Sequence, residues 1–258
     1  MATFETLEVS VQGAIGYMAL ARPKRLNALS RQTLQDLAQA SRWFDEQRDV
    51  KVVVVSGQGT SFCAGFDLND FMNPDPEWGV RESADLGRLM AEAVTNMNAL
   101  TIASIHGNCI GGGVVLAASC DLRVATDSAN FVIPEVDLGI PLAWGGIPRL
   151  VREIGPAATK ELVLTCRPFG SAEAKSLGFL NTIVSEAELD NHVQALAESL
   201  AAKPGYSLRT TKQQVNAVTE EMIGTARNAN DADSLVIATY DAESRAASAA
   251  YLKSKKKG

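Results

Sequence analysis

Hydrophobic and polar residues alternate near the start of the chain, in TLEVSVQGAIGYMALARP at positions 6–23. Side chains of a strand point alternately to its two faces, so this alternation predicts a strand. Gly13 interrupts the pattern, and a second apolar run follows it. The segment therefore predicts an antiparallel hairpin, which ends at Pro23.

A helical pattern comes next, in SRQTLQDLAQASRWFDEQ at positions 30–47. Its apolar residues recur every three or four positions, and Ser30 is a candidate N-cap. The following run, VKVVVVSG at 50–57, is short, continuous and β-branched, which is typical of a strand buried on both faces. A strand, a helix and a buried strand in this order predict a layered β–α–β fold.

The middle of the chain alternates between predicted strands and helices. Two prolines break every period in NDFMNPDPEWGV at 69–80, so we expect a loop there. Strands are predicted at 100–107, 121–126 and 130–133. Helices are predicted over about 81–98, 155–166 and 171–179, the last with Ser171 as N-cap and Gly178 just past its end.

From Glu186 onward the pattern is wholly helical, with a break at KPG (203–205) and two further helices over about 206–222 and 228–250. We therefore expect a core over residues 1–200 and a helical region over 201–258. A helical tail of this kind commonly packs against a neighbour or a partner subunit.

Composition excludes several classes of protein. The chain has 258 residues, 46% of them hydrophobic and 21% charged, which suits one large domain or a domain with a small appendage. No apolar stretch approaches ~20 residues, and the N-terminus lacks the features of a secretory signal, so we expect a cytoplasmic protein without a membrane span. The net charge of -6 argues against nucleic acid as a partner.

The negative net charge does not exclude a small phosphorylated ligand, which needs only a few local cations. Basic residues gather in ARPKR (21–25) and in KSKKK (253–257).

The four cysteines form no CxxC pair and the two histidines stand at no ligand-like spacing, so no metal site is expected. The cysteines are interpreted as small buried hydrophobes.

The common nucleotide-binding and hydrolase motifs are absent: the chain has no P-loop, no complete dinucleotide fingerprint and no GxSxG elbow. Two glycine-rich turns remain, FCAGFDL at 62–68 and HGNCIGGGVVLAASCDLRVA at 106–125. In the second, glycines precede a helix, where backbone N–H groups lack partners and a missing Cβ lets a ligand approach. If the N–H groups of Phe66 and Gly112 point to one spot, they form an oxyanion hole, in which each donor contributes roughly 2.7–4 kcal/mol at the transition state.

Five ordered segments resemble those of the crotonase family, the enoyl-CoA hydratase/isomerase superfamily. They are RPKRLNALS (22–30), SFCAGFDL (61–68), HGNCIGGGVVLAASCDLRVA (106–125), ANFVIPEVDLGIPLAWGGIPRLVREIG (129–155) and RPFGSAEAKSLGFLNTIV (167–184). The resemblance implies an α/β fold, a spiral of ββα units followed by a C-terminal helical region used in trimer assembly. It also implies self-association as a trimer or a dimer of trimers, and an acyl-CoA thioester as ligand.

The same resemblance implies roles for named residues. The thioester carbonyl would lie between the N–H groups of Phe66 and Gly112, and the ligand-binding residues would include Ala64 and Trp144. Asp67, Leu68 and Asn69 would flank the pantetheine and adenine end, and Lys24 and Arg25 would lie near the CoA phosphates. The C-terminal lysines could contribute from a neighbouring subunit. No cofactor is implied, because coenzyme A is part of the substrate.

The carboxylates around the acyl group decide the reaction, since the fold alone does not. The family's hydratases carry two glutamates; here the first position is Val115 and the second is Glu135. A third position, which holds Asp in some dienoyl isomerases and dehalogenases, is Ala143. One base can move a double bond from the 3 to the 2 position by taking the α-proton and returning it at the γ-carbon. The sequence therefore favours Δ3,Δ2-enoyl-CoA isomerisation by Glu135.

Two alternatives stay open at this point: an enoyl-CoA hydratase that works with one glutamate, and a non-catalytic fatty acyl-CoA-binding protein. Glu135 is expected to have a raised pKa among Val136, Leu138, Leu142 and Trp144, because an apolar environment penalises the charged form. Trp144, Phe71, Met72 and Trp78 are candidates for the acyl-pocket wall. His106 is interpreted as structural.

Overall fold

A computed structural model describes residues 3–73, 80–228 and 230–255 of the chain. A six-stranded sheet runs through it in the order β1 (Leu7–Gln12), β2 (Ile15–Leu20), β3 (Val52–Gly57), β4 (Leu100–Ile105), β6 (Leu122–Thr126) and β9 (Thr182–Val184). A smaller sheet holds β5 (Asn108–Ile110), β7 (Asn130–Val132) and β8 (Phe169–Gly170). Except for the predicted β1–β2 hairpin, all pairs in the large sheet are parallel.

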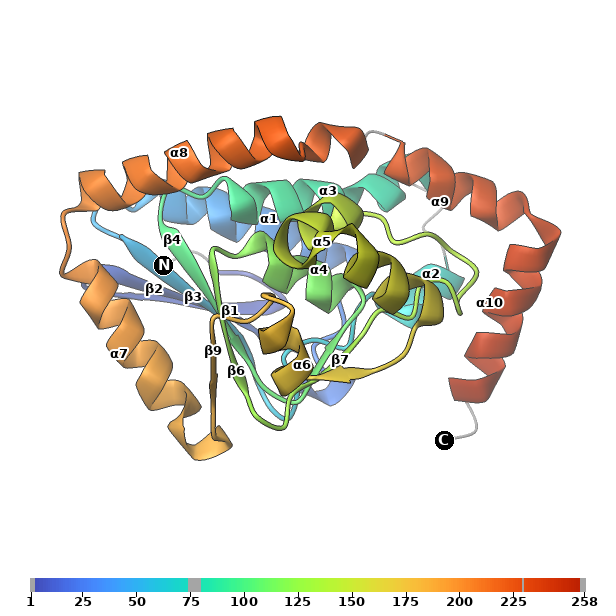
Figure 1. The fold of residues 1–258 in the computed structure, drawn as a ribbon, viewed down its shortest axis with the longest axis horizontal. Coiled ribbons are helices and arrows are strands. Elements are labelled where there is room, and N and C mark those ends of the chain that lie inside the picture. Colours follow the sequence, from blue (N-terminus) through green and yellow to red (C-terminus); the bar gives the residue numbers. More distant parts are fainter. Residues whose placement is uncertain (1–2, 74–79, 229, 256–258) are drawn as a thin grey trace.

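The helices are α1 (Arg31–Glu46), α2 (Leu68–Met72), α3 (Val80–Thr95), α4 (Gly112–Ser119), α5 (Gly146–Thr165), α6 (Ser171–Ser176), α7 (Leu189–Ala201), α8 (Gly205–Met222), α9 (Asp231–Tyr240) and α10 (Ala242–Lys255). Successive turns of the chain visit the large sheet, the small sheet and then a helix, as in β4–β5–α4 and β6–β7–α5. This is the predicted spiral of ββα units. Figure 1 shows α7 at one side of the sheet, α8 across the top of the view, and α9 and α10 descending at the opposite end.

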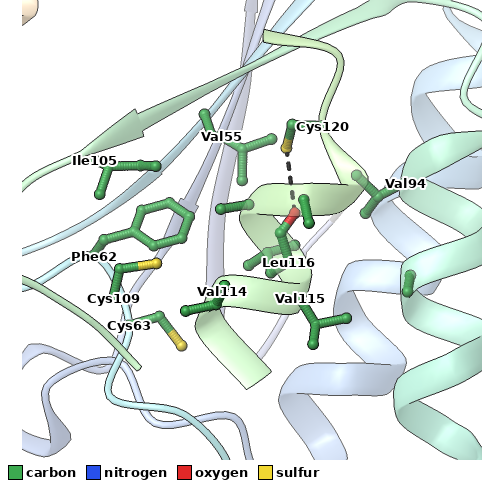
Figure 2. Packing of buried hydrophobic residues seen from close by; sticks show 14 of the residues in the cluster. Val55, Phe62, Cys63, Val94, Ile105, Cys109, Val114, Val115, Leu116 and Cys120 are labelled. Atoms are coloured by element: carbon green, nitrogen blue, oxygen red, sulfur yellow. Dashed lines mark hydrogen bonds between the residues drawn. The ribbon is translucent and has the colours of Figure 1, made fainter. Parts of the chain in front are cut away.

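The hydrophobic core lies on both faces of the large sheet. On one face the sheet packs against α1, α3 and α4, and Figure 2 shows the buried side chains around α4. On the other face Val52 and Val54 pack with Leu189 and Val193 of α7. The four valines of β3 are at most 5% exposed, so the prediction of a strand buried on both faces is confirmed. All four cysteines are buried, as expected, and each is a free thiol.

Several boundaries differ from the sequence-based prediction, each for a local reason. The predicted loop at 69–80 is wrong at its start, because Asp67 caps the short helix α2 through the amide of Asn69. The predicted helix at 155–166 is only the second half of α5, which starts at Gly146 and kinks at Gly155 (φ 77°). Ser30 caps α1 as predicted.

Ser171 does not cap α6, contrary to the prediction. Gly170 occupies the N-cap position, and the Ser171 hydroxyl donates to the carbonyl of Thr126 in the neighbouring strand. The predicted helix at 228–250 is divided in two, with Asp241 between α9 and α10.

One buried amide fastens the first glycine-rich turn to the segment that precedes α1. Asn27 is 1% exposed, has a left-handed backbone (φ 55°), and donates from Nδ2 to the carbonyls of Gln58 and Ser61 at 2.8 Å. Its Oδ1 accepts from the amide of Arg22 at 3.0 Å. Asn tolerates this conformation better than most residues, because its short polar side chain bonds locally.

We expect Asn27→Ala to lower the free energy of unfolding by about 2 kcal/mol, because it leaves buried carbonyls unpaired and places Ala at positive φ. Urea unfolding measures the change, with Asn98→Ala at an exposed position as the matched control. Equal stability of the two variants would show that this amide does not fasten the turn.

Candidate active site

The segment 62–67 lies between two other stretches of chain and bonds to both. On one side the Leu29 amide donates to Gly65 and the Asp67 amide donates to Leu29, at 2.8 and 2.9 Å. On the other side the Cys63 amide donates to Asn108, and the Ile110 amide donates to Cys63, both at 2.9 Å. The segment therefore continues the small sheet beyond β5 for a few residues.

This pairing decides where the Phe66 amide points. In a parallel bridge the bonded groups belong to the residues on either side of the bridged one, so bridged Phe66 turns its N–H away from Leu29. Beyond Ile110 the neighbouring chain leaves the sheet and enters α4, and no carbonyl of the described chain accepts from Phe66. The Phe66 amide is thus available to a ligand.

Gly112 supplies a second free amide at the start of α4. The preceding residue, Gly111, has a backbone that favours glycine (φ 48°, ψ -113°) and no side chain to cap the helix. In the described part of the chain the Gly112 amide finds no acceptor either. The two turns are close: a Cβ built on Gly65 would lie 3.8 Å from the Gly112 nitrogen.

Both residues line one cavity of about 300 Å³. The other described residues around it are mostly apolar, and they come from α1, α2, α3, α4, α9 and the segment between β7 and α5. They are Arg31, Asp70, Ser83, Ala84, Val115, Glu135, Ile140, Pro141, Leu142, Ala143, Trp144, Leu235 and Thr239. The cavity therefore brings together Phe66, Gly112, Glu135 and Trp144, four of the residues singled out from the sequence.

Glu135 brings a carboxyl group into this apolar cavity. It follows β7, and its Oε1 would be 2.5 Å from a Cβ on Gly111, so the side chain lies against the turn that opens α4. The residue as a whole is half-buried, but its Oε2 is buried without a hydrogen-bond partner. Burial raises the pKa of Glu135 to about 7, and a bond from its own amide lowers it in part.

The predicted apolar environment of Glu135 is correct only in part. Leu142 and Trp144 line the cavity, whereas Val136 is 40% exposed. Val115 and Ala143 are buried and face the same cavity, so the two positions without a carboxylate are apolar walls. Trp78 and the side chains of Phe71 and Met72 lie outside the described part of the chain.

The residues expected to contact coenzyme A are not among the described residues that line the cavity. Lys24 and Arg25 form an exposed 3-10 turn that is tied to the active-site segment, because the Ala64 amide donates to the carbonyl of Leu26 at 2.9 Å. Leu68 and Asn69 begin α2.

Asp67 differs from its neighbours because its carboxylate is already occupied. The residue is buried, forms an ion pair with Arg22 at 2.8 Å and caps α2. A role in positioning the turn suits Asp67 better than direct contact with a ligand. His106 contacts the carbonyl of Gly59 at 3.0 Å, which suits the structural interpretation.

Sequence reasoning missed Arg31, Asp70 and the contribution of α9. Asp70 Oδ2 accepts from the Arg31 amide at 2.7 Å, and the Arg31 guanidinium donates to the Asp70 carbonyl at 2.7 Å. Leu235 and Thr239 reach the cavity only because α9 packs on α3. Nothing in the local sequence pattern predicts that packing.

Within residues 3–73, 80–228 and 230–255 no group of three or more His, Cys, Asp or Glu residues could hold a metal ion. A separate search of those residues finds no helix long and apolar enough to cross a membrane.

Comparison with known proteins gives a consistent result. The model of a family described as enoyl-CoA hydratase/isomerase matches residues 10–257. The chain is 35% identical over 227 residues to the peroxisomal Δ(3,5)-Δ(2,4)-dienoyl-CoA isomerase of Arabidopsis thaliana, over 82% of each protein. It is 32% identical over 240 residues to the crotonyl-CoA hydratase of Syntrophomonas wolfei, over 92% of each. A solved enoyl-CoA hydratase from Bacillus anthracis matches with a TM-score of 0.80 at 29% identity, over 90% of this chain and 91% of that one.

The pKa of Glu135 predicts how stability depends on pH. The folded protein holds this proton up to about pH 7, whereas the ordinary pKa is 4.5, so folding takes up a proton between these values. Stability therefore falls as pH rises through this window. We expect Glu135→Gln to raise the free energy of unfolding at pH 8, by up to about 3 kcal/mol, and to have little effect at pH 4.5.

Urea unfolding at the two pH values measures this difference. Glu46→Gln, at an exposed position, is the matched control for the loss of one carboxylate. A gain that is the same at both pH values would mean that the Glu135 carboxyl is not held in its protonated form by burial.

Proposed function

Since the chain belongs to the enoyl-CoA hydratase/isomerase family and is an enzyme of the crotonase type, we propose that it is a Δ3,Δ2-enoyl-CoA isomerase with Glu135 as its single base. The observation that carries the proposal is the buried Glu135 carboxyl, whose Oε2 has no hydrogen-bond partner among the described residues, in a cavity with two free backbone amides. Asp70 also lines the cavity, but it is engaged by Arg31.

The proposed reaction has two proton transfers. The amides of Phe66 and Gly112 donate to the thioester oxygen, which acidifies the α-carbon and stabilises the negative charge of the enolate. Glu135 removes the α-proton and returns it to the γ-carbon, so the double bond moves into conjugation with the carbonyl. A base with a pKa near 7 is well matched to this exchange at neutral pH.

Enoyl-CoA hydratase is the second candidate, favoured by the similarity to relatives such as the crotonyl-CoA hydratase of Syntrophomonas wolfei. Hydration normally uses one carboxylate to activate water and another to deliver a proton. Val115 and Ala143 are apolar walls of the cavity, and Asp70, the other carboxylate among its described lining residues, accepts from the Arg31 amide. The described lining thus offers no second unengaged carboxylate, which supports isomerisation over hydration.

The remaining parts of the proposal concern binding and assembly. The exposed cations Lys24 and Arg25 would hold the CoA phosphates, Ala64, Leu68 and Asn69 would line the path of the pantetheine, and no further cofactor is required. Large apolar side chains on the C-terminal helices are exposed, which supports self-association through residues 201–258 as a trimer or a dimer of trimers. They are Tyr206, Val215, Val218, Met222, Ile237 and Tyr240.

Incubation with a 3-enoyl-CoA is expected to produce the conjugated thioester chromophore. Below pH 7, kcat/KM should fall about tenfold per pH unit, because the base works only when deprotonated, and it should level off above pH 7. Glu135→Gln should lower turnover by about 10²–10⁴-fold and leave acyl-CoA binding intact. Full turnover in this variant would end the assignment of the base.

Val115→Glu would restore the second carboxylate that hydratases of the family carry. We expect it to accelerate hydration of a 2-enoyl-CoA, seen as loss of the chromophore, relative to Val115→Gln as the neutral control of the same size. A wild type that hydrates as fast as it isomerises, or equal hydration by the two variants, would contradict the proposal that one carboxylate supports isomerisation and hydration needs a second.

A further inference from the structure

Three locally unfavourable features meet at one side chain, Trp144. Gly87 lies near the middle of α3, where glycine is less favourable than alanine. Trp144 has a left-handed backbone (φ 62°), which is rare for a bulky residue. Arg149 is 2% exposed, and its Nε has no partner. Such departures from local preference tend to concentrate at functional positions.

The glycines form a slot for the indole between α3 and α4. A Cβ built on Gly87 would lie 2.0 Å from Cδ2 and Cε2 of Trp144, and one on Gly112 would lie 2.3 Å from its Cζ3. Any larger residue at either position would collide with the ring. The glycine inside α3 is therefore explained by the ring that packs against it.

The turn that carries the indole is held from two other helices. Arg149 of α5 donates from Nη1 to the carbonyls of Trp144 and Gly145, at 3.4 and 3.1 Å, and from Nη2 to Thr95 Oγ1 at 3.2 Å. Among the described residues no carboxylate lies within ion-pair distance of Arg149. Asp231 at the start of α9 accepts from the Gly145 amide at 2.8 Å.

The seated indole borders the two free amides. It packs edge-on against Phe66, with ring centroids 5.7 Å apart and an interplanar angle of 89°. It also lines the cavity beside Gly112, where an acyl chain would leave the thioester. The ring thus fills the space between α3 and α4 that a longer chain would otherwise enter.

We propose that Trp144 is the specificity-determining residue of the site and restricts it to short acyl chains, with Arg149 and Asp231 as positioning residues. This inference rests on the proposed acyl-CoA site and adds the substrate class to it.

Two substitutions should move the chain-length preference in opposite directions. Trp144→Ala removes the ring from the space between α3 and α4. Gly87→Ala adds a Cβ that collides with the ring and displaces it toward the cavity. We would measure calorimetrically the Kd values of two saturated thioesters, with four-carbon and ten-carbon acyl groups. Relative to wild type, the Kd ratio should shift about tenfold or more toward the longer chain in Trp144→Ala, and toward the shorter chain in Gly87→Ala. Gly170→Ala is the control, since a Cβ there meets nothing within 4 Å.

The double variant tests whether Gly87→Ala acts through the indole of Trp144. Without an indole to displace, Gly87→Ala should no longer change the Kd ratio in a Trp144→Ala background. Trp144→Phe, which preserves an aromatic ring, should show a smaller shift in the same direction as Trp144→Ala. Unchanged ratios, or shifts of both single variants in the same direction, would overturn the inference.

The positioning role of Asp231 has its own readout. Asp231→Ala removes the acceptor for the Gly145 amide and should weaken the discrimination between the two thioesters, whereas Asp231→Asn keeps an acceptor and should restore it. Equal discrimination in both variants would remove Asp231 from the proposal. Since saturated thioesters bind without reacting, failure of isomerase turnover would be seen separately from failure of chain-length selection.

Discussion

Two backbone amides that find no acceptor in the described part of the chain define this site, and the fold creates both. The Phe66 amide is free because segment 62–67 is bridged at Leu29 on one side while its other neighbour has already turned into α4. The Gly112 amide is free because the first turn of any helix leaves its N–H groups unpaired. The spiral places the edge of one turn beside the helix start of the next, so two separate local effects produce one pair of donors.

The second requirement is a carboxyl group that can exchange a proton with carbon at neutral pH. Glu135 meets it through burial among apolar side chains and against Gly111, without an ion-pair partner within the described chain. Burial opposes the charged form, so the feature that suits Glu135 to act as a base also makes the folded state less stable above neutral pH. Under the proposed function, the lack of a second unengaged carboxylate among the described lining residues favours proton transfer between carbons over the addition of water.

Local patterns in the sequence were sufficient for the features that depend on a few neighbouring residues. The hairpin around Gly13, the buried valines of β3, the cap at Ser30 and both glycine-rich turns follow from periodicity and turn chemistry. The strands β5, β8 and β9 have only two or three residues, too few to display a period. The first half of α5 was missed because it begins after a left-handed turn at Trp144 and Gly145.

Contacts between distant parts of the chain account for the rest of the site that the sequence did not reveal. Gly87 looks like a defect of its helix until the indole of Trp144 is seen against it. The sequence also gives no sign that α9 lines the cavity, because α9 lies far along the chain from the glycine-rich turns. The residue pattern within a segment indicates which secondary structure that segment favours. Gly87 and the lining residues of α9 are instead explained by contacts with segments that are distant in the sequence.

The polarity of the bound thioester carbonyl tests the pair of amides most directly. Infrared difference spectroscopy with an isotope-labelled carbonyl would report its stretching frequency on a saturated acyl-CoA in the complex. If both amides donate to this oxygen, the frequency is lower than for the same thioester in water, with or without the Glu135 carboxylate. A frequency equal to or above the value in water would show that the two amides do not bind the carbonyl.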